Sequence, residues 1–574
     1  MAIQSSNPPQ LHTWSQWQGL NQQDGRGSIG DDEEYWNENL FAIGPGNLRS
    51  CWNHGRILYT APTGKKIVRI FFGFIGDTTP QFGSPPPGRY GWMFLDDGTI
   101  DQVDLDNTDP TTAVHVGGAG TKVWNPIAPQ YWASAKVWRP KYFGTVAGQG
   151  GGVLFGSPAD TVNNIGGLYA WDGTTLSGPG APAPDWLTNA LETGTGPFTM
   201  PNINSLPGIY AMEVYQSRLF VAGKDIIAFS APSNGADFAT VDGGGTLGYT
   251  GDRLTYSYMD LAQSAGFLFV FGDSSIDVIH NIILSGSGTP ESPFITDLTY
   301  ENIDPQVGQR FPRPVGRIGR YMEMWNAAGI FELRGGEARE IGQKITNIFN
   351  TLDTTQYFPT MATATMFGFR VLLCNGRFTD PFGNTRNLLL MWHPSQGREF
   401  WSVASQNLEL TNIGAYEQDS VITPFGTDGT NLYQLFAQPD IIPGVSSPLL
   451  KILSTKFLRG QQMSQLTIKN WKRLYLEFYD NSALQNGVHF AGTFTTTGGG
   501  VPNGVNNVEF ALAPGQVLAT SVPTSGGVTR TPGFEPQAIQ AAGISGAVDI
   551  QSLSLDFTIE RLHVTLEERT LWGA

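Results

Sequence analysis

The 574-residue sequence has little charge, almost no cysteine and no long apolar run. Charged residues make up 15% of the chain, against roughly 25% in an average globular protein, so much of the surface should be polar but uncharged, or covered by other chains. The two cysteines, Cys51 and Cys374, have no Cys-x-x-Cys partner, which excludes a disulfide framework and favours a reducing compartment. The apolar runs are too short to cross a bilayer, and residues 1–10 lack the regions of a signal peptide. We expect a soluble chain without a membrane anchor.

Positive charge is scarcer still, because the formal net charge is −16. A sequence-independent grip on nucleic acid comes from Lys and Arg that neutralise phosphates, and the same residues attract proteins to anionic membrane surfaces. The composition therefore disfavours a nucleic-acid-binding protein and a peripheral membrane protein.

Motifs that carry chemistry are missing as well. The seven histidines form no pair at metal-ligand spacing, and Gly64-Lys65-Lys66 lacks the flanking residues of a phosphate loop. Asp104, Asp106 and Asp109 resemble part of a calcium loop without its central Gly and closing Glu, so polar turns are the better interpretation. No Gly-x-Ser-x-Gly elbow occurs. We predict no catalytic, cofactor-binding or metal-binding residue and no enzyme activity, although paired carboxylates of a glycoside hydrolase stay open among the 50 acidic residues.

What the sequence does contain is turn residues and aromatics. Gly (71), Pro (37) and an aromatic content of 12% predict many short strands joined by tight turns, which is an all-β fold. Apolar runs that end in turn residues recur as similar hairpins. They lie at residues 92–98, 168–173, 218–229, 266–279, 329–336, 388–392 and 432–436.

The hairpins recur at intervals of 44 to 63 residues from Leu168 onward. A period near 50 with four strands per repeat is typical of a β-propeller blade. We predict a propeller of six or seven blades over residues 65–450. The alternative is two or three β-sandwiches, whose hairpins recur less evenly.

Two further regions flank the propeller. Residues 1–64 should form an N-terminal arm with a short helix, because Ser28 precedes the acidic run 31–34 as a cap would, and Trp36 and Leu40 are four apart. A metal site or partner patch is the alternative interpretation of that run. Residues 451–574 should form a small C-terminal β-domain with long Gly-rich loops.

The strands expected in this C-terminal domain alternate apolar and polar residues at 472–478 and 553–559. The apolar parity then switches, which predicts a bulge near Glu560 or Arg561.

One basic segment stands out in the acidic chain. Its arginines are helically spaced, but Pro312 and Pro314 forbid a regular helix, so we expect a loop. This loop is a candidate subunit interface or phosphate contact; the alternative is a solvated connection between blades. The arginines are Arg310, Arg313, Arg317 and Arg320.

Several of these segments together resemble a known family. They are Gly19-Leu20-Asn21, the acidic run with residues 36–40, and residues 217–238, 266–280 and 329–341. In this order they resemble tail nozzle proteins of short-tailed bacteriophages, also called tail tubular protein B. The resemblance covers about half the chain; the Pro-rich insertion at residues 85–87 and the C-terminal region match nothing in that family.

The resemblance implies a six-bladed propeller subunit of a homo-hexameric ring in the virion tail, assembled in the host bacterial cytoplasm. Its partners would be portal and adaptor proteins and other tail proteins such as fibres, spikes or needle. The ring would close the DNA channel and conduct viral DNA during ejection, without specific binding. The competing hypotheses are a glycan-binding receptor protein and a propeller glycoside hydrolase.

Overall fold

The computed structural model confirms an all-β fold. The helical elements that lie wholly within the described residues are one 3-10 turn, η3 (Gln343–Ile345), and one helix, α1 (Thr346–Phe349). No described helix has the length and hydropathy needed to span a membrane. The described residues are 9–44, 46–75, 88–107, 109–128, 132–138, 152–160, 162–163, 165–171, 173, 175–178, 209–223, 226–232, 235, 238–248, 258–289, 291–304, 307–309, 311, 315–326, 328–334, 337–395, 400–437, 448–458, 468–481, 487–497, 505–512, 518–519 and 537–569. The insertion at 85–87 lies outside them.

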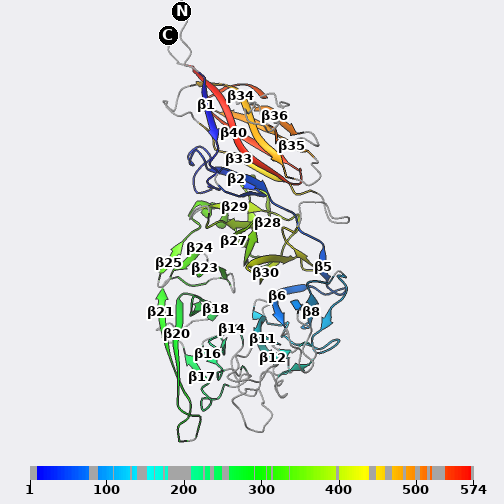
Figure 1. Ribbon diagram of the computed structural model, residues 1–574, viewed down its shortest axis with the longest axis vertical. Coiled ribbons are helices and arrows are strands. Elements are labelled where there is room, and N and C mark those ends of the chain that lie inside the picture. The colour runs from blue at the N-terminus through cyan, green and yellow to red at the C-terminus, as the bar shows by residue number, and fades with distance from the viewer. Residues whose placement is uncertain are drawn as a thin grey trace, which may run out of the picture.

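Seven sets of four antiparallel strands follow one another along the chain (Figure 1). The first three are β6 (Ile67–Ile75), β7 (Gly88–Leu95), β8 (Ile100–Asp104) and β9 (Val114–His115); β10 (Ser134–Trp138), β11 (Gly152–Asp160), β12 (Ile165–Trp171) and β13 (Leu176–Ser177); and β14 (Ala211–Tyr215), β15 (Arg218–Ala222), β16 (Ile226–Phe229) and β17 (Gly245–Gly248). The fourth and fifth are β18 (Tyr258–Ser264), β19 (Phe267–Gly272), β20 (Ile276–Ser285) and β21 (Ile295–Asp304); and β22 (Val315–Ile318), β23 (Tyr321–Trp325), β24 (Ile330–Arg334) and β25 (Glu337–Glu340). The last two are β26 (Thr360–Met366), β27 (Phe369–Thr379), β28 (Thr385–Trp392) and β29 (Trp401–Ala404); and β30 (Asn412–Gln418), β31 (Val421–Thr427), β32 (Asn431–Gln434) and β5 (Ile57–Thr60).

The first strands of these sets contact one another in order. Contacts join β6 to β10, β10 to β14 and β14 to β18, then β22 to β26, β26 to β30 and β30 back to β6. Between the fourth and fifth sets, the Ser264 hydroxyl donates to the carbonyl of Arg320 at 2.9 Å, and Phe269 shares a buried cluster with Met322. We call this arrangement of seven sets the ring.

The hairpin spacing predicted six or seven sets and the family resemblance implied six; the described residues form seven, so six is not confirmed. The seventh is completed by β5, which comes from the segment assigned to the N-terminal arm. The residues treated as equivalent in the sequence analysis lie on two different strands of their sets. Leu219 and Leu268 lie on second strands, whereas Leu168, Phe331, Leu388 and Leu432 lie on third strands. Second and third strands look alike in sequence because both are buried on both faces.

Two further sheets pack face to face above the ring in Figure 1, and we call this part the sandwich. One consists of strands that extend the sixth set into a nine-stranded sheet: β2 (Glu34–Glu38), β33 (Lys451–Thr455), β39 (Ser545–Ser552), β35 (Val488–Thr497) and β36 (Val505–Leu512). The other is seven-stranded: β1 (Gln10–Trp14), β3 (Leu40–Ala42), β4 (Leu48–Ser50), β34 (Ile468–Asp480), β37 (Leu518–Ala519), β38 (Gln537–Gly543) and β40 (Phe557–Arg569). Their inner faces share one buried core, in which Phe478 and Phe557 from one sheet contact Phe490 from the other.

The predicted bulge is confirmed at Glu560. Glu477 pairs with Arg561 and Phe478 pairs with Ile559, so Glu560 is the extra residue in β40. The strand expected over 553–559 is wrong in its first part, since β39 ends at Ser552 and β40 begins at Phe557.

The predicted N-terminal helix is wrong. Residues 34–38 form β2, which pairs with β33 and β29. Residues 36–40 are all buried, so burial alone shows no period; a spacing of four between apolar residues fits a helix and a strand alike, and pairing with distant strands makes this segment a strand. Strands β1 and β4 likewise pair with the distant β40, and β3 pairs with β4. The domain limits at 64 and 450 stay a prediction, but strand pairing crosses both.

Candidate functional site

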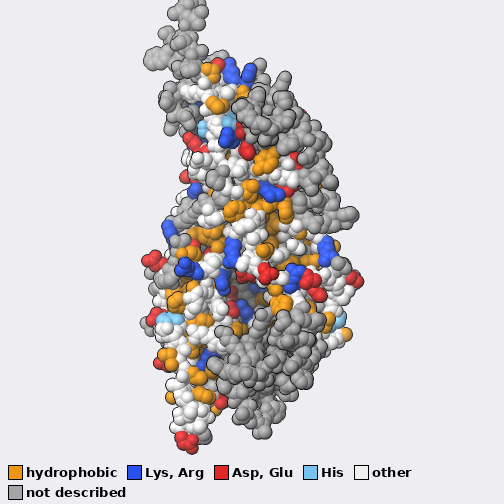
Figure 2. Space-filling view, viewed as in Figure 1, with side chains coloured by type: hydrophobic (Ala, Val, Ile, Leu, Met, Phe, Trp, Pro, Cys, Tyr) orange, Lys and Arg blue, Asp and Glu red, His pale blue; other side chains and the backbone are white. Residues whose placement is uncertain are grey.

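The ring surrounds an open cavity of about 470 Å³. Residues from the first strands of six of the seven sets line it, namely β6, β10, β14, β18, β22 and β26. Figure 2 shows blue and red side chains gathered around a hollow near the middle of the ring. A cavity shared by six separate sheets exists only when the whole ring is formed.

Charged side chains of both signs lie in this cavity. The basic ones are Arg69 on β6, Lys136 on β10 and Arg317 on β22. The acidic ones are Glu213 on β14 and Asp260 on β18, so they come from two neighbouring strands. Alternate residues of a strand lie on the same face. In each of these short, mostly apolar strands, the charged residue lies on the face that lines the cavity.

Lys136 and Glu213 neutralise each other across adjacent sheets. The Lys136 ammonium lies 2.8 Å from a Glu213 carboxylate oxygen, and the two side chains are 36% and 14% exposed. This pair joins the second and third sets at their innermost strands.

Arg317 has a different environment. Its Nε donates to the carbonyl of Gly319 at 3.2 Å, within its own hairpin. The backbone of Arg317 is held by the Thr363 hydroxyl, which donates to its carbonyl at 2.7 Å and accepts from its N–H at 3.3 Å. No described residue forms an ion pair with the Arg317 guanidinium, which is exposed at the cavity.

The predicted basic loop is therefore only partly in place. Arg310 and Arg313 lie outside the described residues. Arg317 lies in strand β22 rather than in a loop, and Arg320 lies in the turn to β23, because residues 315–318 pair with 321–324. Of these two, Arg317 lines the cavity and Arg320 does not.

The other charged residues of the cavity were missed from the sequence. The sequence does contain a pattern that could have identified three of them. Arg69, Lys136 and Glu213 are each the one charged residue in a stretch of five that is otherwise neutral. Nothing local shows that these stretches are the first strands of their sheets, so only the ring brings them together.

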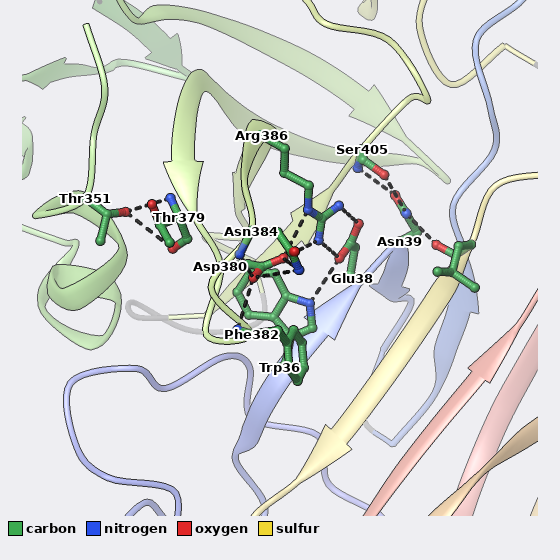
Figure 3. A network of polar contacts seen from close by, with 11 residues as sticks. Trp36, Glu38, Asn39, Thr351, Thr379, Asp380, Phe382, Asn384, Arg386 and Ser405 are labelled. Carbon is green, nitrogen blue, oxygen red and sulfur yellow. Dashed lines mark hydrogen bonds and ion pairs between the residues drawn. The ribbon is translucent and has the colours of Figure 1, made fainter.

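A second polar cluster joins the sandwich to the ring (Figure 3). Arg386 on β28 donates through both terminal nitrogens to the two carboxylate oxygens of Glu38 on β2, at 2.6 Å each. Its Nε donates to Asp380 at 3.1 Å, and the Trp36 indole donates to Glu38 at 3.0 Å. Glu38 and Asp380 are 2% and 4% exposed, so the two carboxylates of this link between the sandwich and the ring are buried.

Several ionisable groups with shifted pKa values lie away from the cavity. Burial raises the pKa of Glu34 on β2 to about 8. Burial and the charge of Glu332, opposite it on β24, raise the pKa of Glu323 well above its usual range. Burial lowers the pKa of His393 to about 3. None of these groups lines the cavity, so they bear on stability.

Of the aspartates that resembled a calcium loop, Asp104 ends strand β8, Asp106 lies in the turn that follows, and Asp109 lies in the connection to β9. Asp104 accepts from the N–H of Asp106 at 2.9 Å, and Asp109 accepts from the N–H of Thr111 at 2.9 Å. In the part of the chain that the structure describes, no three His, Cys, Asp or Glu side chains are grouped as metal ligands would be.

No family model and no curated protein matches the chain. Among solved structures, it is similar to BBS1N in complex with ARL6DN, at 9% identity and a TM-score of 0.36, over 67% of this chain and 97% of that one. It is also similar to a Trypanosoma rangeli sialidase in complex with 2,3-difluorosialic acid, at 8% identity and a TM-score of 0.24, over 92% and 97% of the two chains. An exo-1,5-α-L-arabinanase from a bovine ruminal metagenomic library has 11% identity and a TM-score of 0.20, over 39% and 90%. These values are too low to assign the chain to a family.

Proposed function

We propose that the chain is a structural tail protein of a short-tailed bacteriophage, with the seven sets of strands as blades of a β-propeller. Six copies form a nozzle that extends the DNA channel below the portal and adaptor, closes it in the virion and conducts the genome during ejection. The segments that resemble the nozzle family support this proposal, since they fall in three consecutive sets: on the second and third strands of two of them, β15–β16 and β19–β20, and on the third and fourth strands of the next, β24–β25.

The observation that carries the proposal is a long hairpin at the edge of the ring. β20 and β21 pair from Ile276 out to Ser285, whereas β19 pairs with β20 only as far as Ile279. The outer half of this hairpin therefore extends beyond its own sheet, at the lower end of Figure 1. We call it the arm.

The arm exposes apolar side chains. Ile283 and Ile295 are each 60% exposed and, by their pairing register, point to the same side of the hairpin. Exposed apolar residues on a projecting element favour a contact with another chain. In a ring of identical subunits, the arm of one copy would contact its neighbour, and low surface charge reduces the cost of burying such a contact.

Replacing both Ile283 and Ile295 by Asp should abolish assembly of the sixfold ring on phage connectors. A buried contact cannot accommodate unpaired carboxylates, while the free subunit exposes both positions and should keep its unfolding temperature. Electron microscopy of particles and thermal unfolding of the free subunit measure the two effects.

The matched control is Val162→Asp, an apolar residue 90% exposed in the turn between β11 and β12. It should assemble normally. Normal rings with the arm variant, or a symmetry other than sixfold in particles, would refute the proposal.

The acidic composition leads to a separate expectation. Purified protein should bind duplex DNA only weakly at physiological salt, because few cations are present to displace counterions. A filter-binding titration at two salt concentrations measures this, and tight, salt-sensitive binding would contradict a channel that lets DNA slide.

A second candidate function, a glycan-binding or glycan-cleaving propeller, is favoured by one observation. The carboxylates of Glu213 and Asp260 come from neighbouring strands and line one cavity, as a pair of catalytic carboxylates would. We expect the wild-type protein to release no sugar from polysaccharides. Hydrolysis that Asp260→Asn abolishes would establish this alternative instead.

A further inference from the structure

The central cavity has an unequal distribution of charge. Glu213 and Asp260 lie on one side, on β14 and β18, with Lys136 paired to Glu213. Going round the ring in the other direction, from β22 through β26 and β30 to β6, the charged residues that line the cavity are Arg317 and Arg69. The charge on this side is therefore positive, in a chain whose net charge is −16.

Arg317 is the cation best placed to take a ligand. Its Nε donates to the carbonyl of Gly319, while the described residues form no ion pair with its terminal nitrogens. The Thr363 hydroxyl fixes the backbone of Arg317 from the next sheet, so the base of this side chain is held in place. A guanidinium presents parallel N–H groups that match the two oxygens of a carboxylate or phosphate.

The rest of the cavity suits a polar organic molecule. Gln263 and Asp260 line the cavity from β18, in the set next to that of Arg317; the Gln263 amide can donate to or accept from hydroxyl groups, the Asp260 carboxylate can accept from them, and Phe71 adds an aromatic surface. A volume of about 470 Å³ lies within the range of small-molecule sites, about 300–1,000 Å³.

We propose that the ring cavity binds a small organic anion, with its carboxylate or phosphate group on Arg317 and its polar remainder toward Asp260 and Gln263. The site lies within one chain, so this proposal is independent of the assembly proposed above.

Isothermal titration calorimetry of the full chain tests the proposal with three probes: inorganic phosphate, glucuronate and glucose. Glucuronate and glucose share a hydroxylated ring, and glucuronate alone carries a carboxylate. We expect binding of glucuronate, phosphate or both, and markedly weaker binding of glucose. Preference for phosphate over glucuronate identifies a phosphorylated ligand, and the reverse preference identifies a carboxylated one.

Arg317→Gln should weaken anion binding by about tenfold or more, the usual effect of losing a charge-assisted hydrogen bond. Arg317→Lys, which keeps the charge without the planar fork, should retain part of the affinity. The matched control is Arg320→Gln, three residues away in the same hairpin and outside the cavity lining, which should bind as the wild type does.

Unfolding temperatures of the three variants show whether each is folded. The proposal is wrong if neither anion binds, if glucose binds as well as glucuronate, or if Arg317→Gln and Arg320→Gln have equal effects.

Discussion

Replacing Arg386 by Met should lower the free energy of unfolding by about 3 kcal/mol, the usual cost of removing one partner from a buried ion pair. The Glu38 carboxylate is 2% exposed and would lose both of its 2.6 Å bonds to Arg386. Asp380 would also lose its only cation among the described residues. Chemical denaturation, followed by tryptophan fluorescence, measures the change.

Arg370→Met is the matched control for this variant. Arg370 pairs with Glu417 at 3.0 Å, but the two side chains are 37% and 53% exposed, so its loss should cost at most about 1 kcal/mol. The double variant Arg386→Met with Glu38→Gln should recover part of the loss, because no buried charge is left on Glu38. Equal destabilisation by Arg386→Met and Arg370→Met would show that the polar cluster around Arg386 does not hold the sandwich to the ring.

Replacing Glu34 by Gln should stabilise the protein at pH 8 and have little effect near pH 4. The pKa of Glu34 is about 8 in the folded chain, because it is buried, and its ordinary value is 4.5. The folded state therefore binds the proton more tightly, so stability falls as pH rises from 4.5 to 8, by about 4 kcal/mol for this one group. The Gln variant should lack this fall. Thermal unfolding at intervals between pH 4 and pH 8 measures it.

The neighbouring Glu33→Gln variant should behave in the opposite way. Burial alone would raise the pKa of Glu33, but hydrogen bonds from Lys344, from the Gly30 N–H and from Asn21 lower it overall. Its stabilisation is present above pH 4.5 and is lost as pH falls, so Glu33→Gln should destabilise at pH 8. If both variants changed stability in the same direction at pH 8, the assigned environments would be incorrect. His12, His54 and His393 also titrate below pH 6.5, but they are present in every variant and cancel in the comparison.

The all-β fold was predictable because turn residues and alternating patterns are local signals. The hairpins around Leu219 and Leu268 and the bulge at Glu560 were found in this way. The role of residues 34–38 was not predictable, since a Trp36–Leu40 spacing fits helix and strand alike, and the strands that pair with β2 are hundreds of residues away. The number of sets could not be fixed for the same reason, because β5 completes a sheet whose other strands begin at Asn412.

The cavity illustrates the same division between local and long-range information. The sequence singled out Arg317 because arginines cluster around it, but it gave no reason to join Arg317 to Arg69 or Asp260. These residues meet because their strands occupy the same position in successive sheets, which depends on closing the ring. Lys136 and Glu213 are 77 residues apart, and their ion pair has no signature in the sequence between them.

The pairing of β5 with β32 has a consequence for how the protein is made. β5 ends at Thr60 and its hydrogen-bonding partner begins at Asn431, so some 370 residues must be synthesised before the seventh sheet can form. At bacterial translation speeds of about 5–20 residues per second, β5 leaves the ribosome roughly 20–75 seconds before its partner exists. The interval between the synthesis of a strand and of its partner is longer for β1, which pairs with β40 near the other end of the chain. During this interval the early strands have unpaired edges, and neighbouring nascent chains on one messenger RNA offer equivalent edges. A lower growth temperature or coexpression of chaperones should therefore raise the yield of folded protein far more than substitutions on the surface of the folded protein.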